Sequence, residues 1–388
     1  MKLKQKYFIL FIFFTLCFGF VFINSNTVVK ADSLSDSINE QINKIDFTQL
    51  ENFFNSIVSS QNFEFNSVLN KILNGEYNVN YIGTIEYIFN IAFNKVYNFM
   101  PTLVSILAIS ILCGVFQQLK NSFLTEGVAE ITFFVCIMGI ILILSSQIIS
   151  MWENTQITIK NIAKLTEIMS PIILTSMVAV GGNISASVYT PTVAFLSNGV
   201  IAIIQNVVLP LIGIMTIFNI ASNFSSQIKL NKFSDFIIGV IKWTFGIIMT
   251  IYGLFLSVQG FASASFDGIS IKAAKYALSN SIPIVGGFIK DGFDLVLAGS
   301  VLIKNSVGIL VVFALLYCIV SPVITMAVFS LLLKLIASLT EFISDVRISN
   351  FCLSISKTLS YLIACVLVVG VMLFVTVLLM IFSANAFI

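Results

Sequence analysis

The side chains of this chain that could carry chemistry are lysines, aspartates and amides placed within or beside long apolar stretches. A charged side chain at the centre of a bilayer costs about 2.5 kcal/mol or more, which makes it a candidate for function. The competing explanation is that these side chains extend to the headgroup layer and have no further role. Both explanations stay open for Lys272, Lys275, Lys290, Asp291, Asp294 and Lys304. The candidate contacts with a pathway or a partner are Asn183, Gln205, Asn206, Gln259, Asp267, Lys272, Lys275, Asp291, Asp294 and Lys304.

The residue types argue against an enzyme. The chain contains no histidine, which removes histidine acid-base chemistry, histidine-activated nucleophiles and the commonest metal ligand. An intramembrane aspartyl protease would need aspartates on two facing helices, whereas Asp291 and Asp294 share one turn. The six cysteines form no Cys-x-x-Cys pair, and no G-x-x-x-x-G-K-[ST] loop is present to bind ATP. We therefore expect no catalytic activity, no cofactor and no metal, and a net charge of +2 gives no indication of a nucleic-acid partner.

Long apolar stretches must position these residues. A spanning helix needs roughly 20 apolar residues at about 1.5 Å each. A composition of 58% hydrophobic and 10% charged residues would leave a soluble domain with too little polar surface. The sequence therefore predicts an all-α, polytopic transmembrane bundle at 99–388, with connectors at 120–127, 151–167, 222–236 and 334–357. Its clearest spans are 101–119, 128–150, 237–260, 305–333 and 358–384.

The N-terminal part has a different character. Residues 1–31 combine early lysines, an apolar run and a polar end, which is the layout of a secretory signal peptide. The alternative is an uncleaved anchor helix. Residues 32–98 form an acidic segment whose apolar positions recur at helical spacing, so we expect short amphipathic helices outside the cytoplasm. Such a small segment should dock onto the membrane domain or onto a partner.

Glycine recurs every seven residues from 239 onward. Because seven residues advance a helix by nearly two turns, these glycines share one smooth face suited to helix packing. The facing helix belongs either to this chain or to another subunit, and both possibilities stay open. The glycines are Gly239, Gly246, Gly253 and Gly260.

Two segments have irregular character. Residues 168–221 contain several prolines, glycines and amides, which predicts broken helices shielded from lipid inside the bundle. Residues 261–304 are too polar for one span and too apolar for an ordinary loop. We expect a re-entrant or interfacial hairpin there, broken near Pro283 and Gly287, with a charged tip facing water or a partner.

A series of motifs between about 165 and 310 resembles the stage III sporulation protein AE family in order and spacing. The motifs are Met169-Ser170-Pro171-Ile172, Val178-Ala179-Val180-Gly181-Gly182, Gln205-Asn206-Val207-Val208-Leu209-Pro210, Ser257-Val258-Gln259-Gly260, Asp267-Gly268-Ile269-Ser270-Ile271-Lys272, Ala274-Lys275-Tyr276, Pro283-Ile284-Val285-Gly286 and Lys304-Asn305-Ser306-Val307-Gly308. The segment 32–98 and the region after about 335 match in character alone.

The resemblance implies a role in endospore formation in a Firmicute. It implies a non-enzymatic, multi-pass subunit of a sporulation-specific channel or secretion complex that links mother cell and forespore. The location it implies is the mother-cell-derived outer forespore membrane. The partners it implies are the other subunits of the channel, including a cytoplasmic ATPase and ring-forming proteins of the intermembrane space. The alternative function is a stand-alone permease for a small solute.

Overall fold

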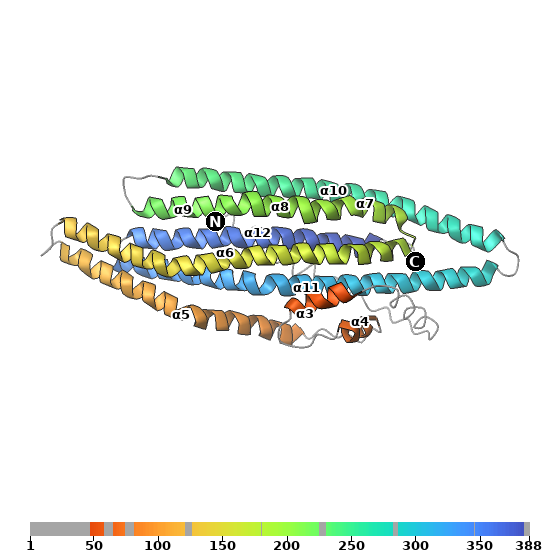
Figure 1. Cartoon of the computed structure of the whole chain (residues 1–388), viewed down its shortest axis with the longest axis horizontal. Helices are drawn as coiled ribbons and strands as arrows, with labels where there is room; N and C mark the ends of the chain where they lie inside the picture. The colour runs from red at the N-terminus through yellow and green to blue at the C-terminus, as the bar shows by residue number, and fades with distance from the viewer. Residues whose placement is uncertain are drawn as a thin grey trace.

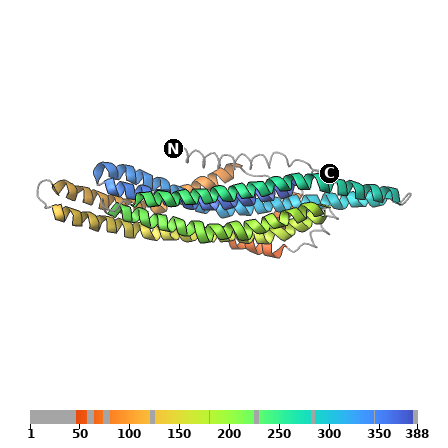
Figure 2. The same ribbon diagram turned by 90° about the horizontal axis from the view of Figure 1, so that it is seen from above.

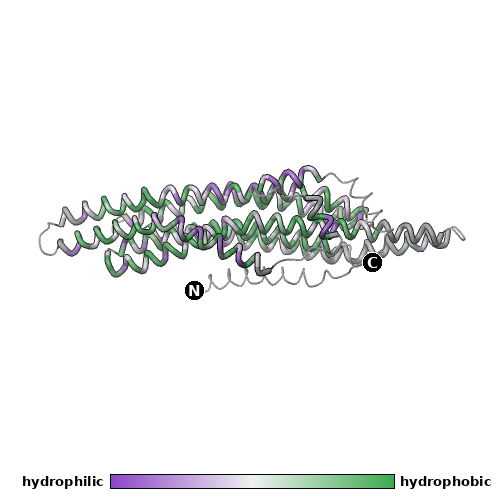
Figure 3. Tube along the Cα trace, turned by 90° about the horizontal axis from the view of Figure 1, so that it is seen from below, coloured by the Kyte–Doolittle hydropathy of each residue, from purple (hydrophilic) through white to green (hydrophobic). Residues whose placement is uncertain are grey.

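The computed structural model describes residues 47–57, 65–73, 81–120, 126–179, 181–224, 230–281, 286–344 and 346–383. Helices make up the regular structure of this part, and no strand occurs in it. The long helices lie side by side in an elongated bundle (Figure 1). Hydrophobic residues run along most of their described length (Figure 3). The predicted all-α membrane bundle is therefore confirmed, whereas the predicted signal peptide at 1–31 lies outside the described residues.

The described helices follow one another with short connections. Their bounds are α3 Thr48–Ile57, α4 Phe65–Leu73, α5 Tyr81–Lys120, α6 Glu126–Ala179, α7 Asn183–Ala194, η1 Phe195–Val200, α8 Ile201–Ile203, η2 Ile204–Val208, α9 Leu209–Phe224, α10 Asn231–Ser281, α11 Gly286–Ile343 and α12 Val346–Ser383. The labels η1 and η2 denote π-helical turns.

Six helical segments of the described part are long and apolar enough to cross a membrane: Ile85–Gln118, Glu130–Ala179, Asn183–Asn223, Lys232–Gln259, Leu297–Ile343 and Val346–Ser383. Several of these segments are longer than the roughly 20 residues that a spanning helix needs. At about 1.5 Å per residue, α6 is about 80 Å long, against a hydrocarbon core of about 30 Å. Such a helix must extend past the hydrocarbon core at one end or at both.

The prediction of a connector at 151–167 is wrong, because α6 runs through these residues as one helix of 54 residues. Its apolar side chains Ile159, Ile162 and Leu165 are fully buried, at the spacing of a helix face. Its charged side chains, such as Lys160 and Lys164, lie exposed on the other side of the same helix. The expected connector at 334–357 is likewise mostly helical, with α11 ending at 343 and α12 starting at 346.

The predicted break in 168–221 occurs at a glycine pair. Gly181 has a φ of 86°, in the left-handed region that glycine enters without a Cβ penalty. The Gly182 N–H donates to the Met177 carbonyl, and the Gly181 N–H donates to the Val178 carbonyl, both at 2.9 Å. These two bonds close the end of α6 in a Schellman motif. The prolines of this segment lie inside helices instead of ending them, as Pro171 does in α6 and Pro191 in α7.

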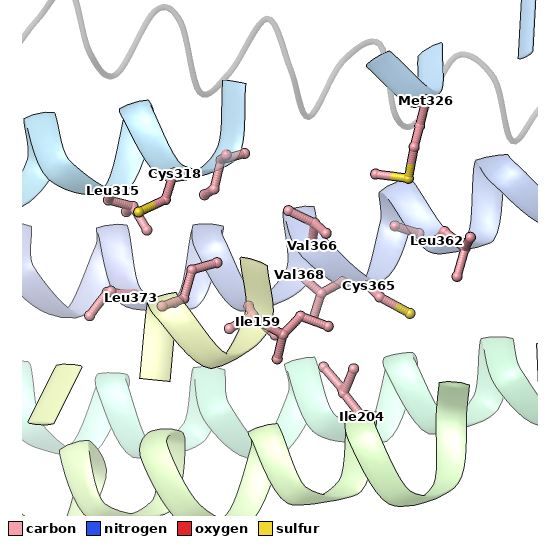
Figure 4. Close-up of a cluster of buried hydrophobic side chains, with 14 of the residues drawn as sticks. Ile159, Ile204, Leu315, Cys318, Met326, Leu362, Cys365, Val366, Val368 and Leu373 are labelled. Atoms are coloured by element: carbon pink, nitrogen blue, oxygen red, sulfur yellow. The ribbon is translucent and has the colours of Figure 1, made fainter. Parts of the chain in front are cut away.

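The core centres on α12, which contacts α11, α9, α6, α10 and α7. Figure 4 shows Val366, Val368 and Leu373 of α12 among side chains from α6, η2 and α11. Lipid is as apolar as these side chains, so close van der Waals packing holds the helices together more than removal from water does. The helix at the centre of the bundle is therefore the last one in the described chain.

The acidic N-terminal segment packs on the bundle through two short helices. α3 contacts α6 and α11, and α4 contacts α11. On α3, Leu50, Phe53 and Phe54 are buried, as their helical spacing predicts. The Nζ of Lys164 on α6 lies 6.0 Å from the centroid of the Phe53 ring, within range of a cation–π contact. Docking of this segment onto the membrane domain is thus visible in the structure.

The segment 261–304 consists of the end of α10 and the start of α11. α10 continues to Ser281, and α11 begins at Gly286. Figures 1 and 2 show these two helix ends projecting together beyond the ends of α6, α7 and α12. The hairpin therefore extends two long helices. Its re-entry into a bilayer stays a prediction.

Candidate functional site

The most unusual polar group inside the bundle is the side-chain nitrogen of Lys304. This residue of α11 is fully buried, at 0% exposure. Its Nζ has no hydrogen-bond partner in the part of the chain that the structure describes. One helical turn further along α11, Gly308 contacts Ile381 near the end of α12, which places Lys304 toward that end of the bundle. Lys304 therefore does not reach the surface of the bundle, and its side chain does not extend to the lipid headgroups.

Gln259 links two helices. Its side chain is buried on α10, and its Nε2 donates to the backbone carbonyl of Val188 on α7 at 2.9 Å. Gln205 lies in η2, half-buried, and its Nε2 has no partner among the described residues. A π-helical turn shifts the register of side chains along a helix and often marks a functional position. Gln205 and Gln259 thus have buried amide groups, and their contact with a pathway or a partner stays a prediction.

The remaining candidates divide into two groups. Asn183 at the start of α7 and Asn206 in η2 are exposed. No hydrogen bond joins the side chains of any two of Asn183, Gln205, Asn206, Gln259 and Lys304 in the described structure. These residues therefore do not form one site. The side chains of the other candidates lie outside the described residues, and these are Asp267, Lys272, Lys275, Asp291 and Asp294.

The predicted glycine face on α10 does not pack within this chain. A Cβ added at Gly239, Gly246 or Gly253 would meet no atom within 4 Å. The buried side of α10 is the opposite one, where Ile241 and Ile248 contact the core. Of the two possibilities, packing inside the chain does not occur at these three glycines in the described structure, and packing against another subunit stays a prediction. Gly260 lies outside the residues whose surroundings are described.

Other glycines lie where two helices approach each other closely, and the sequence did not predict these contacts. A Cβ at Gly114 of α5 would lie 1.9 Å from the carbonyl oxygen of Ile343 at the end of α11. A Cβ at Gly370 of α12 would lie 2.2 Å from Cδ1 of Ile319, and one at Gly308 would lie 2.3 Å from Cδ1 of Ile381. These glycines are isolated in sequence, so no repeat pattern distinguishes them.

Hydroxyl groups tie three helices to α12, and sequence reasoning missed these as well. Tyr252 of α10 donates to the Met372 carbonyl, and its Oη lies 2.6 Å from Oγ1 of Thr376. Oγ1 of Thr216 on α9 lies 3.0 Å from Oγ1 of Thr358.

On the α11 side, the hydroxyls of Ser330 and Ser356 are 2.7 Å apart. Most hydroxyls in these helices bond to a carbonyl of their own helix, so their sequence positions do not reveal which ones reach across. The bonds that cross between helices fix the register of α9, α10 and α11 on α12.

The described residues offer little reactive chemistry. No group of three or more His, Cys, Asp or Glu side chains in the described part could hold a metal ion. Cys113, Cys318, Cys352 and Cys365 are buried and form no disulfide bond within the described residues, and buried cysteines of this kind pack as small apolar side chains. The arrangement is suited to holding helices and presenting surfaces.

Comparisons with known proteins identify a family for this chain. The chain matches the family described as Stage III sporulation protein AE over residues 63–384. It is 28% identical to Stage III sporulation protein AE of Bacillus subtilis (strain 168) over 319 residues, covering 82% of this chain and 79% of that protein. No solved structure matches it. The family match covers most of the chain, from just before α4 to the end of α12. This chain therefore belongs to the stage III sporulation protein AE family.

Proposed function

We propose that this chain is a non-enzymatic membrane subunit of a sporulation-specific channel or secretion complex that links mother cell and forespore. Membership of the family supports the role in sporulation. The six apolar helices support a multi-pass membrane protein. We place it in the mother-cell-derived outer forespore membrane, where it serves forespore development.

The observation that carries the proposal is the filled interior around α12. Val366 and Leu373 of this helix are at 0% exposure, and apolar side chains of the neighbouring helices lie around them (Figure 4). A permease for a polar solute needs a route lined by polar groups or water, because unsatisfied polar atoms in an apolar interior cost several kcal/mol. A packed apolar centre favours a subunit whose pathway is completed by other proteins.

In this proposal the pathway lies along surfaces that other subunits share with this chain. The hairpin at 261–304 and the π-helical turns at 195–208 are the segments closest to it. A cytoplasmic ATPase supplies the energy, and ring-forming proteins of the intermembrane space continue the channel toward the forespore. Gln205 in η2, which is half-buried, contributes an amide nitrogen that the chain itself leaves without a hydrogen-bond partner in the described part.

Reconstitution separates the subunit from a permease. The purified chain is placed in liposomes that enclose small fluorescent solutes, and release is compared with that from empty liposomes and from liposomes carrying a pore-forming peptide. We expect the chain alone to give no more release than empty liposomes, and the complex purified from sporulating cells to release solute when ATP is supplied. Release by the chain alone would identify a permease.

A genetic measurement tests the role in sporulation independently. Deleting the gene should leave vegetative growth unchanged and lower the count of heat-resistant spores, and a plasmid copy should restore that count. Normal spore numbers in the deletion strain would overturn the proposal.

A further inference from the structure

The side of α10 that points away from the bundle has an unusual composition for a membrane helix. Helix geometry places Asp235, Gly239, Lys242, Gly246, Thr250 and Gly253 on this side, which we call the α10 outer face. Asp235, Lys242, Gly246 and Thr250 are exposed, and Gly239 and Gly253 are half-buried. The core-facing side of α10 is already filled by residues such as Phe245 and Tyr252.

The outward surfaces of α5 and α6 show what a lipid-facing helix looks like in this protein. Val104 of α5 is 61% exposed, and Val135 and Leu142 of α6 are 67% and 72% exposed. Such bulky apolar side chains suit acyl chains. The exposed side of α10 also carries bulky apolar side chains, such as Trp243 and Leu254, but the α10 outer face adds glycines, a hydroxyl and two charges to them. Lipid tails would solvate the two charges poorly, so Asp235 and Lys242 point to protein as the neighbour.

An open groove of about 480 Å³ also lies on this face, around Gly246. It is lined by Lys242, Trp243, Gly246, Ile247, Thr250 and Ile251. A Cβ built at Gly246 would meet nothing within 4 Å, so nothing in the described chain fills the groove. Trp243, 74% exposed, forms one wall of it. A groove open along a helix axis, with small residues at its base, accepts another helix at close approach.

The charges indicate what kind of helix fits. Asp235 and Lys242 are two turns apart, about 10.5 Å along the axis, and neither forms an ion pair in the described part of the chain. A second copy of this chain inserted in the same orientation would bring Lys242 against Lys242 and Asp235 against Asp235. Like charges at one level repel, so two-fold pairing of this face is unfavourable. A helix with an acidic residue opposite Lys242 and a basic or amide residue opposite Asp235 is complementary.

We propose that the α10 outer face binds a transmembrane helix of a different protein subunit, which presents a carboxylate to Lys242. This inference rests on the proposed function, because it assigns one of the shared surfaces of the complex to a defined helix face. The glycines at 239, 246 and 253 set the distance between the two helices, and the pair Asp235 and Lys242 sets their register.

The test uses the full-length chain in sporulating cells of the source organism. A benzophenone amino acid replaces Thr250 on the α10 outer face, and the same probe replaces Val104 on α5 as a control for lipid-facing positions. After irradiation we expect the Thr250 probe to give a covalent adduct with another membrane protein, and the Val104 probe to give none. An adduct with the mass of two copies of this chain, or no protein adduct at Thr250, would overturn the proposal.

Charge and volume variants sharpen the result. In the strain carrying the Thr250 probe, Lys242→Glu should abolish the adduct, and Lys242→Arg should keep it. Gly246→Leu should also abolish the adduct by filling the groove, whereas Gly127→Leu, at a glycine on α6 that also faces open space, should not. Equal adduct yields in Lys242→Glu and Lys242→Arg would contradict the charge assignment.

The two proposals fail in different ways. If the wild-type chain restores heat-resistant spores to a deletion strain but the Thr250 probe gives no protein adduct, the proposed interface is contradicted. The role in sporulation then still stands. A deletion strain that sporulates normally contradicts the proposed function.

Discussion

Gly114 provides the sharpest test of the packing. Gly114→Ala would place a Cβ 1.9 Å from the carbonyl oxygen of Ile343 and 2.9 Å from its carbonyl carbon. Both are backbone atoms at the end of α11, so no side-chain rotation can relieve the overlap. α5 and the end of α11 would have to separate, which loses dispersion contacts along their interface.

The magnitude follows from two opposing terms. Replacing glycine by alanine inside a helix stabilises it by about 1 kcal/mol, because the unfolded chain loses conformational freedom. Overpacking in a tight core costs about 1–3 kcal/mol, and a clash with backbone belongs at the upper end. We therefore expect Gly114→Ala to lower the free energy of unfolding by about 2 kcal/mol.

The matched control is Gly139→Ala in α6. Its added Cβ would lie 3.5 Å from Cδ1 of Ile109 on α5, which is an ordinary van der Waals contact. The control should therefore leave the free energy of unfolding unchanged or raise it by up to about 1 kcal/mol. Both variants are unfolded by titrating detergent micelles with a denaturing detergent while helix content is followed by circular dichroism. If Gly114→Ala proves as stable as Gly139→Ala, the close approach of α5 to α11 is refuted.

Three further changes probe the hydroxyl contacts, the N-terminal segment and the buried lysine. Tyr252→Phe removes the bonds to Met372 and Thr376 and should lower the free energy of unfolding by about 0.6–1.5 kcal/mol, measured by the same titration; an unchanged value would show that these bonds add nothing. Phe53→Ala should release α3 from α6, because a buried ring is lost, and protease cleavage near residue 60 should accelerate; Asn55→Ala on the exposed side of α3 is the control. Lys304→Met should leave the free energy of unfolding unchanged or increase it, since it removes a buried polar group that has no hydrogen-bond partner in the described part; a lower free energy of unfolding in the same titration would show that the lysine side chain stabilises the bundle.

The sequence by itself determined the membrane class and the helical fold, and it predicted a break somewhere within 168–221. Apolar stretches longer than a bilayer leave helices as the available structure, since backbone polar groups must bond within the segment. The Gly181–Gly182 pair ends α6 because a left-handed residue closes the helix there. The sequence also predicted the buried face of α3, because an amphipathic helix separates its apolar residues from its polar ones.

Tertiary structure decided which faces of the long helices meet. In a helix that is apolar all round, lipid-facing and core-facing sides look alike, so periodicity gives no direction. For this reason the regular glycines of α10 proved to face outward, while the isolated Gly114, Gly308 and Gly370 make the close contacts. The same ambiguity hid the burial of Lys304, which depends on the side chains that neighbouring helices bring to it and not on its own flanking residues.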